Sequence, residues 1–154
     1  MRLCSGEEAS AFIKKLTSEK HQVKPQTLDL TVANVFILKE AGYIDFGGSE
    51  EKEAIVEPLE PLKRSDEDKY GWWSLTEGEY FVEFNEKGMI PENHIGFIRP
   101  LSRTLRAGGF HPALVCLSGE KIDRALFSVG KIGFNVKENA RISSFMLIEL
   151  GSGE

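Results

Sequence analysis

The sequence predicts an all-β domain, and three observations favour this class. Short runs of apolar and aromatic residues follow one another from Pro25 onward. Glycine, proline and acidic residues separate these runs, as turns between strands require. Only one segment, near the N-terminus, has the apolar spacing of a helix. Many short strands without a second long helix favour a sandwich, a jelly roll or a barrel.

The expected helix covers residues 5–20. Apolar residues recur there at helical spacing, namely Ala9, Phe12, Ile13 and Leu16. Ser5 is a suitable N-cap, and Glu7 and Glu8 lie near the positive end of the helix dipole. We expect one amphipathic helix that covers an end of the sheet and has no catalytic role, because no polar residues cluster on it.

The β domain is expected over residues 25–150, within a single domain of residues 1–154. Strands are predicted at residues 27–38, 79–84, 95–98, 113–117, 125–129, 132–136 and 142–150. Turns are predicted at Glu77-Gly78 and Lys87-Gly88. Residues 47–70 are acidic and contain Pro58 and Pro61, which predicts a loop or extended connection with an edge strand inside it. Its charged run, residues 63–69, is expected to be a solvated face.

Composition excludes several classes of partner. The chain has 154 residues, 41% of them hydrophobic, which is enough for one domain with a core and no disulfide or metal to stabilise it. The net charge is −5, so the chain has no general attraction for nucleic acid or for anionic lipid. No apolar run approaches the roughly 18 residues of a membrane span. We expect a soluble, cytoplasmic protein with no nucleic-acid or membrane partner.

The cysteines and histidines show no metal-site spacing. Cys4 and Cys116 lie far apart and have no CxxC or CxxH partner, so we expect both to be reduced and structural. The sequences HxE and PCxxC are absent, which excludes a zinc-dependent base deaminase. His21, His94 and His111 are isolated and are expected to be structural or solvated.

The strongest candidate site is the segment from Arg99 to Gly109. It places three arginines, two hydroxyl side chains and two glycines within eleven residues of an otherwise acidic chain. Arginine forks bind phosphate, hydroxyls add donors, and glycines allow backbone N–H groups to approach the oxygens. The alternative is a short surface helix with solvated arginines.

Three further places could carry chemistry. Asp123 follows a turn and precedes a strand, where a carboxylate either orients a water molecule or caps the turn. Asp29 interrupts an apolar strand and is either an edge charge or a partner of a metal-bound water. Tyr70, Trp72 and Trp73 either stack on a base or pack in a core or subunit interface, and packing is favoured.

Taken in order, these segments resemble the superfamily of deoxyuridine triphosphatases and deoxycytidine triphosphate deaminases. The opening residues 1–4 and the N-terminal helix look like the deaminase branch, and the strand that carries Asp29 resembles the first motif. Residues 100–108 are similar to the phosphate-binding motif PRSSxxxxG. Ser102, Arg106 and Gly108 match, whereas Leu101 and Arg103 replace the first arginine and the second serine.

Two later segments continue the resemblance. Lys121, Ile122 and Asp123 look like the base-binding hairpin motif, whose Ile-Asp pair both branches share. Residues 139–146 resemble the motif GDRIAQLI, with Ser144 where the glutamine stands. The deaminase branch has a catalytic glutamate about ten residues after the hairpin aspartate, and the corresponding residues here are 133–135. No lid motif rich in arginine and glycine follows Leu150.

The resemblance implies a distorted jelly roll, also called a β-clip, and a hydrolase that converts dUTP to dUMP and pyrophosphate. Asp123 would orient the water, the backbone from Ser118 to Ile122 would read the uracil, and Asp29 would meet a magnesium ion through water. Phosphate-binding positions are Ser102, Arg103, Arg106, Gly108 and Ser144. Magnesium is carried by the nucleotide, and the expected assembly is a homotrimer with sites between subunits. Deamination of dCTP, and a non-catalytic nucleotide-binding or structural trimer, are the alternatives.

Overall fold

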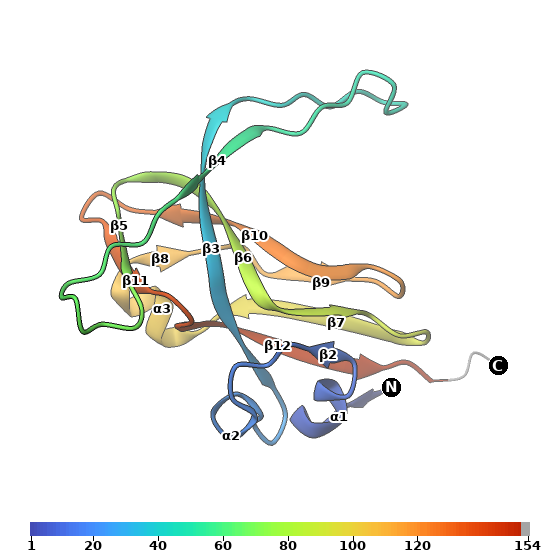
Figure 1. The fold of residues 1–154 in the computed structure, drawn as a ribbon. Helices are drawn as coiled ribbons and strands as arrows, with labels where there is room; N and C mark the ends of the chain where they lie inside the picture. Colours follow the sequence, from blue (N-terminus) through green and yellow to red (C-terminus); the bar gives the residue numbers. More distant parts are fainter. Residues whose placement is uncertain (152–154) are drawn as a thin grey trace.

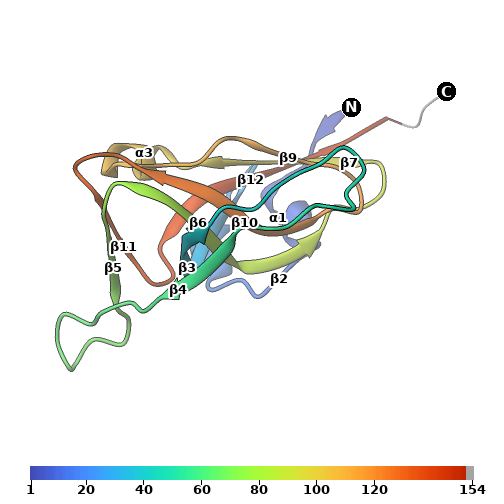
Figure 2. The same ribbon diagram turned by 90° about the horizontal axis from the view of Figure 1, so that it is seen from above.

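A ten-stranded antiparallel sheet dominates the computed structural model, which describes residues 1–151 (Figure 1). Along it the strands follow the order β8 (Gly109–Phe110), β10 (Lys121–Val129), β6 (Gly78–Met89), β3 (Leu28–Glu40), β12 (Arg141–Glu149), β7 (His94–Pro100) and β9 (Leu114–Cys116). β1 (Arg2–Leu3) pairs with β12, β2 (Ile13–Lys14) with β6, and β4 (Ile55–Leu59) with β3. β5 (Trp72–Leu75) and β11 (Phe134–Lys137) form a second, two-stranded sheet, which lies at one end of the molecule (Figure 2). This curled sheet confirms the predicted all-β, jelly-roll-like class.

The long strands β3 and β6 form the centre of the sheet. β6 alternates buried and less buried residues from Tyr80 to Glu86, as expected for a strand with one face on the core. β3 is buried at every position from Leu28 to Val32, where it pairs with β12, and it pairs with β6 further along. Register shifts lie near this change of partner, between Val32 and Asn34 on β3. The shifts are consistent with β-bulges that bend the sheet around the core.

The prediction of one helix over residues 5–20 was wrong. The chain forms α1 (Gly6–Ser10), then β2, then α2 (Glu19–Gln22). Ser5 does cap α1, in a capping box with Glu8. Ile13 then pairs with Gly88 of β6, and Lys15 adopts a φ of 64°. Pairing with a long strand therefore overrides the helical spacing of the apolar residues, because only extended backbone satisfies that edge of β6.

The predicted turn at Lys87-Gly88 was also wrong, because β6 continues through both residues. Gly88 pairs with Ile122 of β10 and with Ile13 of β2. A Cβ at Gly88 would lie 2.5 Å from the carbonyl oxygen of Phe12, so the glycine here allows close backbone approach instead of a turn.

Residues 47–70 form the expected extended connection, and β4 is the edge strand inside it. The segment between β3 and β4 projects beyond the sheet as an arm (Figure 1). Within residues 1–151, the structure has no helix of the length and apolarity that crossing a bilayer requires. The expectation about a missing lid concerns the C-terminal end, of which residues 152–154 lie outside the described part of the chain.

Candidate functional site

The basic segment forms the short helix α3 (Ser102–Ala107) at one end of the sheet. The Thr104 hydroxyl donates a hydrogen bond to the Ile142 carbonyl oxygen at 2.7 Å, which fastens α3 to β12. Gly108 ends the helix with a φ of 107°, a conformation that favours glycine. The predicted short surface helix and the predicted phosphate-binding segment are therefore the same element.

The three phosphate-binding candidates on α3 are exposed and are neighbours on the helix surface. Ser102 and Arg106 are four residues apart and lie on the same face of the helix. Arg103 lies one position further round, where it lines a cleft against β11 and β12. Arg103 is also three residues from Arg106, so the three side chains form one exposed surface, and its Arg103 end borders this cleft.

Behind α3, the strands that carry the remaining motifs lie side by side. Ser144 of β12 is opposite Asp29 of β3 on one side and Arg99 of β7 on the other. Asp29 is buried and accepts a hydrogen bond from the Arg141 guanidinium, with 2.9 Å between Nη1 and Oδ2. Ser144 is also buried. The sheet thus brings three predicted motifs together, with an ion pair at their centre.

A buried carboxylate that the sequence reading missed lies beside this ion pair. Glu86 has no exposed surface, and its carboxylate accepts hydrogen bonds from the Thr31 N–H (2.9 Å), the Thr31 hydroxyl (2.6 Å) and the Gln22 amide (2.5 Å). The Gln22 amide also donates to the carbonyl oxygen of Asp29 at 2.9 Å. Burial raises the pKa of Glu86 above its ordinary value, although these donors oppose the shift. The alternation of β6 was the available signal, because Glu86 follows Val82 and Phe84 on the buried face.

His111 is the second buried titratable group near this end. Its Nε2 lies 2.7 Å from the Ser143 hydroxyl and its Nδ1 lies 2.8 Å from the Pro112 carbonyl oxygen. A carbonyl only accepts, so Nδ1 carries the proton and Nε2 accepts from Ser143. Burial lowers the pKa of His111, which favours this neutral form. The ring therefore has the structural role that the sequence predicts.

The hairpin candidates lie at the start of β10. The turn before it contains Ser118, whose hydroxyl donates to the His94 carbonyl oxygen, and Gly119 with a φ of 86°. Ile122 is buried and Lys121 is exposed. Asp123 lies inside β10 at a register shift, and its half-exposed carboxylate is 3.4 Å from the Lys87 ammonium. Asp123 also lines a cleft that three lysines share, namely Lys14, Lys87 and Lys121.

Within one copy of the chain, the hairpin and α3 lie at opposite ends of the sheet (Figure 1). The far end of β10 pairs with β8, where Ser128 faces Phe110 directly after α3. Asp123 is five residues from Ser128, so the strand alone separates them by roughly 17 Å at about 3.3 Å per residue. One copy of the chain therefore does not bring Asp123 to Arg103 and Arg106.

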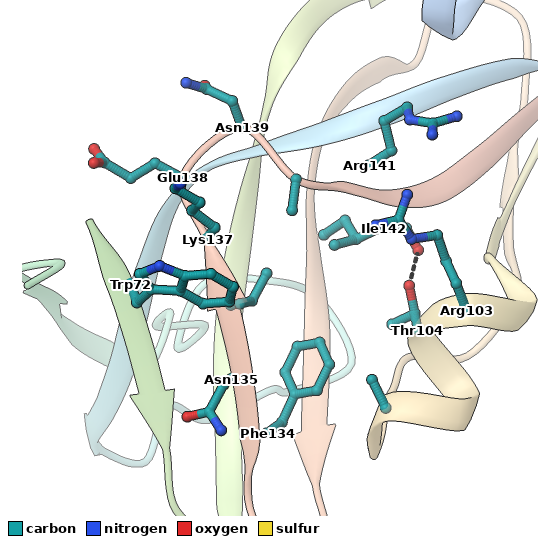
Figure 3. Close-up of a pocket in the computed structure, with 13 residues that line it drawn as sticks. Trp72, Arg103, Thr104, Phe134, Asn135, Lys137, Glu138, Asn139, Arg141 and Ile142 are labelled. Atoms are coloured by element: carbon teal, nitrogen blue, oxygen red, sulfur yellow. Dashed lines mark hydrogen bonds between the residues drawn. The ribbon is translucent and has the colours of Figure 1, made fainter. Parts of the chain in front are cut away.

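A cleft of about 390 Å³ lies between α3 and the β5–β11 sheet (Figure 3). Trp72, Phe134 and Arg103 stand around it. The neighbouring Trp73 is buried and its indole N–H donates to the Leu59 carbonyl oxygen at 2.8 Å, as expected for core packing. Trp72 instead remains partly exposed and faces the cleft.

Sequence relatives and the fold together place the chain in the superfamily of dUTP hydrolases and dCTP deaminases. The fold resembles that of a 2'-deoxycytidine 5'-triphosphate deaminase from Agrobacterium tumefaciens, with a TM-score of 0.68 and 16% identity. The similarity covers 97% of this chain and 48% of the deaminase chain, and it concerns the fold alone. No family model matches the sequence.

Sequence relatives identify the family within this class. The chain is 31% identical over 161 residues to a probable deoxyuridine 5'-triphosphate nucleotidohydrolase of Methanosarcina mazei, covering 99% of this chain and 91% of the relative. A protein of the same name from Methanosarcina acetivorans is 32% identical over 133 residues, covering 85% and 74%. The chain belongs to this family of deoxyuridine 5'-triphosphate nucleotidohydrolases.

Proposed function

We propose that the protein hydrolyses dUTP to dUMP and pyrophosphate. The observation that carries this proposal is family membership, since the relatives named for this activity match almost the whole chain. The meeting of three motif strands behind α3 supports it, because those motifs bear the residues expected to hold a triphosphate.

The phosphates are assigned to the end of the sheet that carries α3. Ser102 and Arg106 form one exposed face, and Arg103 extends it toward the neighbouring cleft. Arginine forks hold phosphate oxygens by paired hydrogen bonds, and the glycine at position 108 opens the backbone there. Ser144 is buried behind this face. Its proposed role is therefore to stabilise β12 at the point where this strand pairs with Asp29 of β3.

The water and the base are assigned to the hairpin. Asp123 takes a proton from the attacking water as a bond forms between the water oxygen and the α-phosphorus. The bond from that phosphorus to the bridging oxygen breaks, and pyrophosphate leaves with the electron pair. The backbone from Ser118 to Ile122 faces the uracil. Because the two halves lie far apart in one copy, the proposed site joins the α3 face of one subunit to the hairpin of another, in a homotrimer.

The residues fit a magnesium ion that the nucleotide carries. Within residues 1–151, no group of three potential metal ligands converges to form an all-protein cage. Asp29 uses Oδ2 for Arg141, so Oδ1 is the oxygen that would accept from a metal-bound water. When bound, magnesium neutralises phosphate charge and orients the triphosphate.

A deaminase reaction is disfavoured by the position of Glu138. Its carboxylate accepts a hydrogen bond from the Gly71 N–H at 2.6 Å and points away from the cleft (Figure 3). The residues that correspond to the catalytic glutamate of the deaminase branch are 133–135, which include no acid. Ammonia release from dCTP is the assay that would reverse this assignment.

Complementation between inactive variants tests both the reaction and the divided site. Asp123→Asn and Arg106→Ala each remove one half, so we expect each variant alone to release little pyrophosphate from dUTP and magnesium. After subunit exchange, mixtures contain some sites with both halves intact, and part of the activity returns. Asp66→Asn, an exposed loop carboxylate, is the matched control and keeps full activity. Failure of the wild type to release pyrophosphate refutes the hydrolase, and failure of the mixture to recover refutes the shared site.

A further inference from the structure

The Trp72 cleft contains an aromatic ring that the proposed hydrolysis does not use. The guanidinium carbon of Arg64 lies 3.9 Å from the centroid of the indole ring. Arg64 lines the depression on the other side of Trp72 and does not line this cleft. One face of the indole is therefore covered by Arg64. The other face borders the cleft, where the Lys137 ammonium lies 5.7 Å from the ring centroid.

The rest of the cleft suits a planar ring. Its inner surface is apolar and includes Phe134, Val136 and Ile142. Asn135 lies at the edge beside Trp72, and its amide offers both a donor and an acceptor (Figure 3). The volume of about 390 Å³ falls within the roughly 300–1,000 Å³ range of small-molecule sites. An aromatic ring with polar edges matches these three features.

The charge of the cleft selects an anion. Arg103 stands across from Trp72, and the Lys137 ammonium lies 5.7 Å from the indole centroid. Glu138 is the one carboxylate among the lining residues, and the Gly71 N–H holds it away from the cleft. These cations disfavour the cationic ligands that aromatic cages bind, and they favour a ring with a phosphate.

We propose that this cleft, which shares Arg103 with the phosphate-binding face of α3, is a second nucleotide-binding site, separate from the hairpin at Ser118–Asp123. The base stacks on Trp72, Asn135 contacts its polar edge, and the phosphate lies between Arg103 and Lys137. Every residue of the site comes from one copy of the chain, so binding requires neither the proposed trimer nor turnover.

Titration with dUMP and with AMP, without magnesium, tests this proposal. In a Trp73→Phe variant only Trp72 remains to report, and we expect both nucleotides to quench its fluorescence. By calorimetry, Trp72→Ala weakens binding about 5- to 150-fold, the range for losing one base stack on an aromatic side chain. Trp73→Phe is the matched control and keeps the wild-type affinity. Ribose 5-phosphate has the anion without the base and binds correspondingly more weakly.

If Trp72→Ala does not fold, a second variant, Lys137→Glu, tests the same site. Lys137→Glu keeps the strand and reverses one charge, and we expect it to weaken both nucleotides at least tenfold with an unchanged circular dichroism spectrum. Equal affinity for ribose 5-phosphate and dUMP, or unchanged binding in a folded variant of either residue, refutes the site. Asp123→Asn separates the two proposals, because it abolishes hydrolysis and leaves quenching of Trp72 intact. A wild type that binds without turnover refutes only the hydrolase.

Discussion

Replacing Glu86 by glutamine tests whether the buried carboxylate stabilises the strands behind α3. Its two oxygens accept from three donors, on Thr31 and Gln22. A glutamine has one carbonyl oxygen, so its NH₂ group must face either the Thr31 N–H or the Gln22 amide. The Thr31 hydroxyl can turn to accept, but one buried N–H is left unpaired in both orientations. That loss costs about 1–3 kcal/mol of unfolding free energy.

The pH dependence of the difference in unfolding free energy between wild type and Glu86→Gln provides the sharper test. Because burial raises the pKa of Glu86, the folded state binds the proton more tightly than the unfolded state. The stability from this group is complete below its ordinary value of 4.5 and is lost as pH rises through the folded value. Urea denaturation between pH 4.5 and 8 should show Glu86→Gln less stable than wild type, with a difference that shrinks at higher pH.

A matched change on the same strand is Glu83→Gln. Glu83 accepts one hydrogen bond, from Asn34 at 2.9 Å, at the surface. We expect a change within about 0.5 kcal/mol. If the difference for Glu86→Gln widens as pH rises, or matches that of the control, the argument from three buried donors is refuted.

Three other changes test neighbouring contacts. Burial lowers the pKa of His111, so the stability that this residue contributes is complete above pH 6.5 and is lost as pH falls. The thermal midpoint of unfolding should therefore fall with pH, and a midpoint that does not change with pH contradicts this prediction. Arg141→Met leaves the Asp29 carboxylate buried without its partner and should cost about 3 kcal/mol in urea denaturation, part of which Asp29→Asn restores. Gly109→Ala places a Cβ 2.4 Å from the Phe127 ring and should cost about 1–3 kcal/mol; a neutral result means that the ring moves freely.

The strands were predictable because buried strand positions are apolar, so each strand appears as an apolar run in the local sequence. β3, β7 and β12 lie where the runs predict them. The segment from residue 5 to residue 20 was not predictable in this way. Its apolar spacing fits a helix, and Ala9 and Ile13 are indeed buried, but the edge of β6 imposes extended backbone at Ile13. A partner 75 residues away, Gly88, decides that conformation.

The candidate site was predictable to the level of motifs. The order of the motifs that carry Asp29, Ser102 and Arg141 was sufficient to indicate the superfamily, and the pairing of β12 with β3 and β7 brings the strands of these motifs side by side. Glu86 and the partly exposed ring of Trp72 depend on side chains from other elements. The alternation of β6 indicates that Glu86 is buried, but the local sequence does not show which donors it meets, nor which of two adjacent tryptophans is in the core.

The separation of the two halves within one chain has an electrostatic consequence. Within residues 1–151, Arg99, Arg103 and Arg106 form no ion pair, whereas Asp123 lies beside Lys87 and Arg124. If Asp123 lay near α3 in the same copy, the arginines would pair with it and their guanidinium groups would be occupied before any phosphate arrived. Because the length of β10 separates Asp123 from α3, the guanidinium groups of the α3 arginines stay unpaired, although the chain as a whole is acidic. The same spacing is the reason that a site combining the carboxylate and the arginines requires a second copy.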